Sequence, residues 1–168
     1  MLAVVSDSSP LVYLTRLGRF ELLHRLYEQV FIPPAVWREV AVEGASRPEG
    51  ACVKQAVADR WLQVESVAWE TVEPDVALLA LDEGEREAIA LARQKRAMLI
   101  IDESDGREVA RRLGVPCTGT LGVLVEAKLR GLIPELKPEL ARLQAETNFR
   151  FPEGLFAAAL RKAGENRT

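Results

Sequence analysis

Short apolar runs alternate along this chain with longer segments in which apolar residues recur every three or four positions. The runs at 2–6, 30–32, 62–67, 97–102 and 115–119 predict buried β-strands. The periodic segments predict helices at 9–17, 19–27, 35–41, 51–58, 83–96, 104–114, 120–132, 134–146 and 152–163, with a loop at 43–50 and a frayed end at 164–168. Alternating strands and helices predict an α/β fold, in which helices cover both faces of a mostly parallel sheet.

Carboxylates stand at the ends of two predicted strands. Asp7 follows the first strand, and the sequence IIDESD places Asp102, Glu103 and Asp105 at the end of the strand at 97–102. In open α/β sheets, ligands bind beyond the carboxyl ends of the strands. We therefore expect Asp7 and Asp102 to emerge at the same edge of the sheet.

Helix capping accounts for only part of this pattern. Ser9 is a suitable N-cap, and Pro10 suits the first position of a helix. Because Ser9 alone would cap that helix, capping leaves Asp7 unexplained. Glu103 or Ser104 can begin the next helix, but a cap does not need three acids.

Two further acids lie on predicted helices. Glu85 falls on the apolar stripe of its helix, one turn before Ala88 and Ile89. A carboxylate on an inward face needs a partner, which a helix N-terminus supplies in part and a metal ion more fully. A first-turn capping acid is the alternative for Glu85. Glu39, in PAVWREV, is equally well explained as a solvated surface residue.

Composition narrows the chemistry of such a site. Apolar residues make up 48% of the chain and charged residues 28%, which is typical of a globular protein. The chain has a single histidine, His24, which lies among leucines and is best explained as a helix-face residue, so a Ser-His-Asp triad or a zinc site is not expected. Metal chemistry would then depend on carboxylates, whose oxygen atoms select Mg²⁺ or Mn²⁺. The net charge of −3 counts against a nucleic-acid partner unless a local basic patch offsets it.

The sequence also bears on location. No apolar run approaches the roughly 20 residues of a membrane span, and the first residues lack the basic segment of a signal peptide. Cys52 and Cys117 make neither a disulfide framework nor a zinc site. We therefore expect a reduced, cytoplasmic protein without a membrane partner.

Several motifs, in order along the chain, resemble those of the PIN domain, a family of metal-dependent nucleases. They are VSDSSPLVYL, FIPPAVWREV, DEGEREAIALA, LIIDESDGREVA, GTLGVLVEAKLRGLI and LRKAGE. The resemblance covers nearly the whole length and is strongest to a bacterial and archaeal branch. It differs where the family has threonine and a second aspartate, because this chain has Ile101 and Glu103. These differences leave open whether Asp102 or Glu103 is the main ligand.

The resemblance implies a three-layer α/β/α fold in one domain of residues 1–168, with C-terminal helices from about 134 packed on it or extending it. It implies a metal-dependent ribonuclease related to VapC-type toxins, with RNA as substrate, an antitoxin protein as a candidate partner and a homodimer as a candidate assembly. The implied catalytic acids, which would bind Mg²⁺ or Mn²⁺, are Asp7, Glu39, Glu85 and Asp102. Glu103 and Asp105 are additional candidate ligands.

Other residues near these acids are candidates for supporting roles. Ser9 could orient Asp7 or donate a hydrogen bond near a phosphate, with an N-cap as the alternative. Arg16, Arg38 and Arg107 lie close in sequence to the acids and could contact RNA phosphates. Solvated side chains and ordinary ion pairs are the alternative for each arginine.

Two other classes of function stay open. In a non-catalytic module that binds a protein or nucleic acid, the acids would be a relic or structural site. Trp37, Trp61, Trp69 and the LFAAAL stretch could then form an interface for a partner protein, with core packing as the alternative for these side chains. A metal-dependent phosphatase of another α/β fold is the third class, but no DxD follows the first strand. RNA loss, turnover of a phosphomonoester, or tight protein binding without turnover would separate the three.

Overall fold

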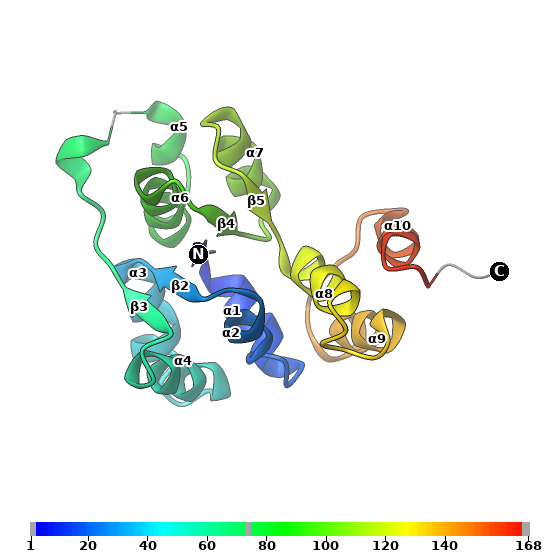
Figure 1. Cartoon of the computed structure of the whole chain (residues 1–168). Helices are drawn as coiled ribbons and strands as arrows, with labels where there is room; N and C mark the ends of the chain where they lie inside the picture. Colours follow the sequence, from blue (N-terminus) through cyan, green and yellow to red (C-terminus); the bar gives the residue numbers. More distant parts are fainter. Residues whose placement is uncertain (1–2, 73–74, 166–168) are drawn as a thin grey trace.

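One parallel sheet of five strands forms the centre of the protein (Figure 1). The computed structural model describes residues 3–72 and 75–165. The sheet order is β3-β2-β1-β4-β5, and all four strand pairings are parallel. The strands are β1 (Ala3–Ser6), β2 (Gln29–Ile32), β3 (Leu62–Val64), β4 (Met98–Ile100) and β5 (Cys117–Thr118). The predicted parallel sheet is therefore confirmed, with β1 in the middle.

Helices make most of the connections between and after the strands. They are α1 (Ser8–Arg16), α2 (Leu22–Leu26), α3 (Pro34–Trp37), α4 (Pro48–Ala58), α5 (Val76–Leu79), α6 (Glu83–Lys95), α7 (Ser104–Arg112), α8 (Thr120–Leu129), α9 (Leu136–Glu146) and α10 (Leu155–Lys162). A π-helical segment, η1 (Arg38–Glu43), continues α3, and a 3₁₀ turn, η2 (Trp69–Thr71), follows β3. Figure 1 shows α5, α6 and α7 on one side of the sheet and α1, α2 and α4 on the other.

Each face of the sheet has its own apolar core. Side chains alternate between faces along a strand. Val4 accordingly packs with the core that includes α1, α2, α4 and α8, whereas Val5 packs with α6 and α7. On β4 and just beyond it, Leu99 and Ile101 face the second core, and Ile100 faces the first. These two cores give the expected three layers.

The α9 and α10 helices pack beside α8. Leu140 and Leu143 of α9 and Ala159 of α10 join the core of the first face. The Oε1 atom of the buried Glu139 accepts a hydrogen bond from Arg19 at 2.5 Å. None of the described helices is both long enough and apolar enough to cross a lipid bilayer.

Several boundaries differ from the sequence predictions. The strand predicted at 62–67 ends at Val64, and the strand predicted at 97–102 ends at Ile100. The predicted loop at 43–50 is shorter, because α4 begins at Pro48, which suits a first helical turn. The helix predicted at 19–27 covers only Leu22–Leu26.

The predicted frayed end at 164–168 includes 166–168, which lie outside the described residues. The described part of that end is held in place. The Glu165 amide donates to the Leu160 carbonyl at 2.8 Å, and the Glu165 carboxylate accepts from the Lys137 amide at 2.9 Å. Because these bonds join Glu165 to two helices, fraying is a wrong prediction at this residue.

Candidate metal centre

The candidate site lies where β1 and β4 end side by side. The chain builds β2 and β3 on one side of β1, and β4 and β5 on its other side. The pair β1 and β4 is therefore the point at which the direction of winding reverses, which is the usual ligand position in such sheets. Asp7 leaves β1 here, and its amide donates to the Ile100 carbonyl of β4 at 2.9 Å.

Three carboxylates come together at this point. Asp7, Glu85 and Glu103 each place one oxygen within 4.8 Å of the oxygens of the other two. We call these three residues the acidic triad. Asp7 and Glu85 are buried and Glu103 is exposed, so the triad opens to solvent on the Glu103 side.

Each member of the acidic triad stands at the start of a helix. Asp7 occupies the N-cap position of α1, and Glu103 the N-cap position of α7, although neither side chain makes a capping hydrogen bond. Glu85 is the third residue of α6 and forms a capping box with Asp82. The positive ends of three helices therefore converge on the carboxylates.

Burial dominates the electrostatics of the acidic triad. It raises the pKa of Asp7 to about 8, more than the Ser8 amide lowers it, and the nearby charges of Glu85 and Asp82 add to the rise. Burial also raises the pKa of Glu85, with Asp82 as the next cause. Among the described residues, no lysine or arginine forms an ion pair with the triad.

Glu39 lies beside the acidic triad rather than within it. Its Oε2 atom accepts a hydrogen bond from the Ser8 hydroxyl at 2.7 Å. A β-carbon on Gly84 would lie 3.6 Å from that oxygen and 3.5 Å from Oδ1 of Asp7, so both acids border the same small space. Glu39 is in the π-helical segment η1, a feature that is frequent at functional sites.

Asp102 has different partners. Its Oδ1 accepts from the Thr120 amide at 2.8 Å, and its Oδ2 accepts from the Thr120 hydroxyl at 2.7 Å. These bonds satisfy a free amide at the start of α8 and join the end of β4 to that helix. Burial raises the pKa of Asp102, and the Thr120 bonds act against that rise. Both of its oxygens are thus engaged away from the acidic triad.

Ser9 is not the N-cap of α1, so that alternative is wrong. The helix begins one residue earlier, at Ser8, with Asp7 in the N-cap position. The Ser9 hydroxyl instead donates to Oε1 of Glu103 at 2.8 Å. It therefore orients Glu103, whereas the sequence pointed to Asp7 or a phosphate as its partner.

The remaining sequence candidates lie around the site. Asp105 is exposed in the first turn of α7, and its charge contributes to the raised pKa of Glu85. Arg16 pairs with Glu49 at 3.8 Å, and Arg38 pairs with Glu83 at 3.2 Å. Arg107 lies near Gly119, where a β-carbon would approach its Nη1 to 2.9 Å.

Sequence reasoning missed three residues that organise the acids. They are Ser8, Asp82 and Thr120. Asp82 could have been found, because D-x-x-E before an apolar periodic segment is a capping-box pattern. The Ser8 and Thr120 bonds join segments far apart in the chain, and no local pattern marks them.

The residues fit a hard divalent cation. The site offers only oxygen ligands, which Mg²⁺ and Mn²⁺ prefer. The buried Asp7 carboxylate makes no hydrogen bond to another side chain in the described part of the chain, although burial of a charge requires a partner. A parallel α/β sheet with an acidic triad at its switch point is thus of the class that suits metal-assisted hydrolysis.

Comparisons with known proteins agree with this class. A family model described as "DUF3368: PIN domain" matches residues 3–165. The chain belongs to the PIN domain family, whose members are generally nucleases that typically use divalent metals. A solved structure, a PilT N-terminus domain protein from the hyperthermophilic archaeon Sulfolobus solfataricus P2, is similar with a TM-score of 0.52 and 23% identity, over 76% of this chain and 93% of that one. At that identity the likeness shows the shared fold. The comparison with curated proteins finds no match.

Proposed function

We propose that this protein is a metal-dependent endoribonuclease that hydrolyses RNA phosphodiester bonds with Mg²⁺ or Mn²⁺. The observation that carries the proposal is the acidic triad, three carboxylate oxygens within 4.8 Å of one another at the switch point of the sheet. Membership in a family of nucleases supports phosphodiester hydrolysis as the chemistry.

Asp7, Glu85 and Glu103 would hold the cation in this proposal. When bound, the cation supplies Lewis-acid chemistry, which lowers the pKa of water and neutralises charge on the phosphate. Ser9 orients Glu103 through its hydroxyl, as Ser8 orients Glu39. Glu39 and Asp105 remain candidate ligands through water.

The geometry favours Glu103 over Asp102 as the ligand that follows β4. Both carboxylate oxygens of Asp102 accept hydrogen bonds from Thr120. Glu103, in contrast, places an oxygen within 4.8 Å of oxygens of both Asp7 and Glu85. We therefore assign Asp102 the role of a positioning residue, which joins the end of β4 to α8. The resemblance implied that Asp102 touches the cation, but in this proposal it acts instead through the position of the chain around it.

The interaction-module alternative loses most of its proposed contacts. Trp61 is buried and stacks on His24, with ring centroids 5.0 Å apart, and Trp37 packs against the core. The LFAAAL stretch also packs partly on the core through Ala159. Trp69, which is 45% exposed, is the one tryptophan of the three that stays open to a partner. An antitoxin partner and a homodimer stay predictions, which size-exclusion chromatography with and without a co-expressed candidate would test.

The proposal is tested by incubating the full chain with mixed-sequence single-stranded RNA and Mn²⁺. We expect cleavage that EDTA stops and that Asp7→Asn lowers by at least about 100-fold, because loss of one ligand disrupts the coordination of the cation. Asp59→Asn, at an exposed aspartate outside the acidic triad, is the matched control and should cleave like the wild type. Equal cleavage by Asp7→Asn and the wild type would overturn the proposal.

A further inference from the structure

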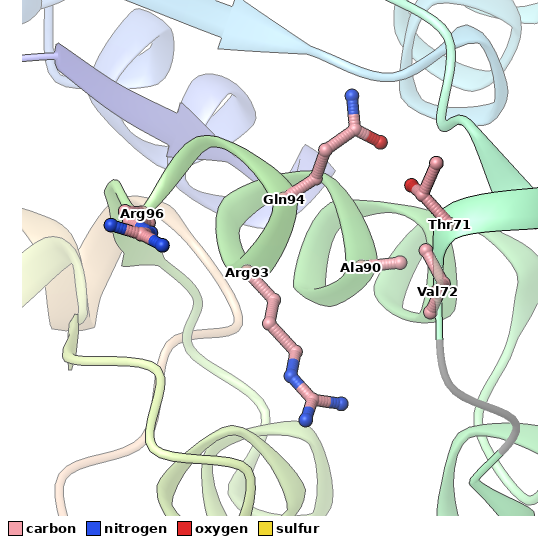
Figure 2. A pocket seen from close by; sticks show the side chains of 6 residues that line it. All are labelled: Thr71, Val72, Ala90, Arg93, Gln94 and Arg96. Carbon is pink, nitrogen blue, oxygen red and sulfur yellow. The ribbon is translucent and has the colours of Figure 1, made fainter.

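Two hollows on the protein surface differ in their relation to the acidic triad. One, of about 310 Å³, lies against the C-terminal half of α6 and is lined by Thr71, Val72, Ala90, Arg93, Gln94 and Arg96 (Figure 2). None of these residues belongs to the acidic triad, and Gln94 accepts a hydrogen bond from the Ala68 amide at 2.8 Å. The other hollow, of about 530 Å³, begins beside the triad, at Ser8, Ser9 and Glu39.

This second hollow is a groove between α1 and the connection from α9 to α10. At one end are Ser8 and Ser9, whose hydroxyls donate to Glu39 and Glu103. One wall continues along α1 through Val12, Tyr13 and Arg16, and the opposite wall comes from Glu146, Thr147, Asn148 and Arg150. We call it the α1 groove.

The α1 wall follows from helical periodicity. Ser9, Tyr13 and Arg16 recur at intervals of four and three, so they share one face of α1, while Leu11 and Leu14 are buried on another. The seven steps from Ser9 to Arg16, at about 1.5 Å each, extend about 10 Å, roughly the axial length of three stacked nucleotides. The groove is therefore long enough to follow a strand beyond the scissile phosphate.

The opposite wall is attached to α1 by Tyr13. Its hydroxyl donates to Oδ1 of Asn148 at 3.0 Å, and its ring meets Phe149 edge-on at 5.2 Å. Burial raises the pKa of Tyr13, the charges of Asp102 and Glu103 add to the rise, and those of Arg16 and Arg150 act against it. Both arginines thus lie close enough to the Tyr13 hydroxyl to act on it electrostatically, as do Asp102 and Glu103.

The charges of the two arginines are only partly neutralised. Arg16 is 46% exposed, and its partner Glu49 is 3.8 Å away. The buried carboxylate of Glu49 accepts no hydrogen bond within the described chain, and Arg16 pairs with it from the groove wall. Arg150 is exposed and donates to the Phe149 carbonyl at 3.3 Å. Glu146, the acid of this wall, already pairs with Arg142 at 3.2 Å.

We infer that the α1 groove binds single-stranded RNA next to the acidic triad, with Arg16 and Arg150 contacting two phosphates. This inference rests on the proposed function for the identity of the strand. It adds Arg150 and the α9–α10 connection to the substrate contacts. Two arginine side chains line the groove near the acids, where they could contact the phosphates of an RNA strand. Arg38 and Arg107 do not line the groove.

The test measures binding of a 5′-fluorescein-labelled 12-nucleotide RNA by fluorescence anisotropy, in EDTA, at several salt concentrations. We expect Arg16→Gln combined with Arg150→Gln to weaken binding about 10-fold and to reduce the salt slope of log K by about 1.4, since each lost single-strand phosphate contact reduces it by about 0.7. The Lys/Lys double variant should keep most of the slope. Arg130→Gln is the matched control, because Arg130 is 50% exposed and also paired with a glutamate.

No wild-type binding at low salt, or an unchanged slope in a folded Gln/Gln variant, would overturn the inference. Circular dichroism confirms that each variant is folded. Because the measurement needs no cleavage, its result is separate from that of the cleavage test. Binding that depends on the groove arginines, without any metal-dependent cleavage, would support RNA binding in the α1 groove and refute the nuclease proposal. Metal-dependent cleavage with an unchanged salt slope would support the nuclease proposal and refute RNA binding in the groove.

Discussion

Replacement of Asp7 by asparagine should stabilise the protein without metal while it abolishes metal binding. Asparagine has nearly the same shape as aspartate but carries no charge. Asp7 is 4% exposed and shares its space with Glu85 and Glu103. The wild type must hold this charge at high pH, and the variant need not.

The raised pKa gives the size and the sign of the effect. An acid whose folded pKa exceeds its unfolded pKa lowers stability as the pH rises through that interval. For Asp7 the interval extends from 3.8 to about 8, so the loss should occur between about pH 4 and pH 8. At about 1.4 kcal/mol for each pKa unit, the upper limit is roughly 5 to 6 kcal/mol. Relaxation and water entry reduce such penalties, so we expect a difference of about 2 to 3 kcal/mol at pH 9.

Urea denaturation in EDTA at pH 5, 7 and 9 measures this effect. The free energy of unfolding of Asp7→Asn should exceed that of the wild type by an amount that grows with pH. For Asp59→Asn, the exposed control, the free energy of unfolding should change with pH as it does for the wild type. With millimolar Mn²⁺ the order should reverse, because only the wild type gains the free energy of metal binding. Equal stability of Asp7→Asn and the wild type at pH 9 in EDTA would refute the reasoning.

Three further substitutions test the bonds that organise the acids. Ser9→Ala removes the hydroxyl that orients Glu103, so isothermal titration calorimetry should show a Mn²⁺ affinity reduced by about 10-fold. Thr120→Val removes a bond to a carboxylate, and urea unfolding should show a loss of about 1 to 3 kcal/mol that Thr120→Ser largely avoids. Gly119→Ala would bring a β-carbon within 2.7 Å of Oδ1 of Asp102, and should also destabilise the protein by about 1 to 3 kcal/mol. Unchanged values in these assays would contradict the assigned roles.

Much of the fold could be predicted because local pattern and burial coincide. The runs around Val5 and Leu99 are apolar throughout, as expected for strands covered on both faces, and both are buried in the sheet. The segment after Val64 was harder to predict. It contains the 3₁₀ turn η2 and the four-residue α5, whose Val76 is 81% exposed, so no sustained apolar period marks either element.

The site could be predicted only in part. Strand ends led to Asp7, and the helical stripe led to Glu85, because each position depends on its own element. The choice between Asp102 and Glu103 depends instead on Thr120, which lies 18 residues beyond Asp102 and accounts for both of its oxygens. Adjacent residues of an irregular segment can point in different directions, and only the tertiary structure shows which one meets the triad.

The convergence of three helix N-termini bears on whether the acidic triad is complete without a cation. Each N-terminus stabilises a nearby negative charge by about 0.3 to 1 kcal/mol, so α1, α6 and α7 together supply at most about 3 kcal/mol. Burial nevertheless raises the pKa of Asp7 to about 8, so the protein's own dipoles do not offset the cost of this charge. A divalent cation would offset the remaining cost of the buried Asp7 charge, and the oxygen ligands for it lie together at the switch point of the sheet. The same deficit that makes Asp7 destabilising in EDTA is therefore what would make the triad bind metal.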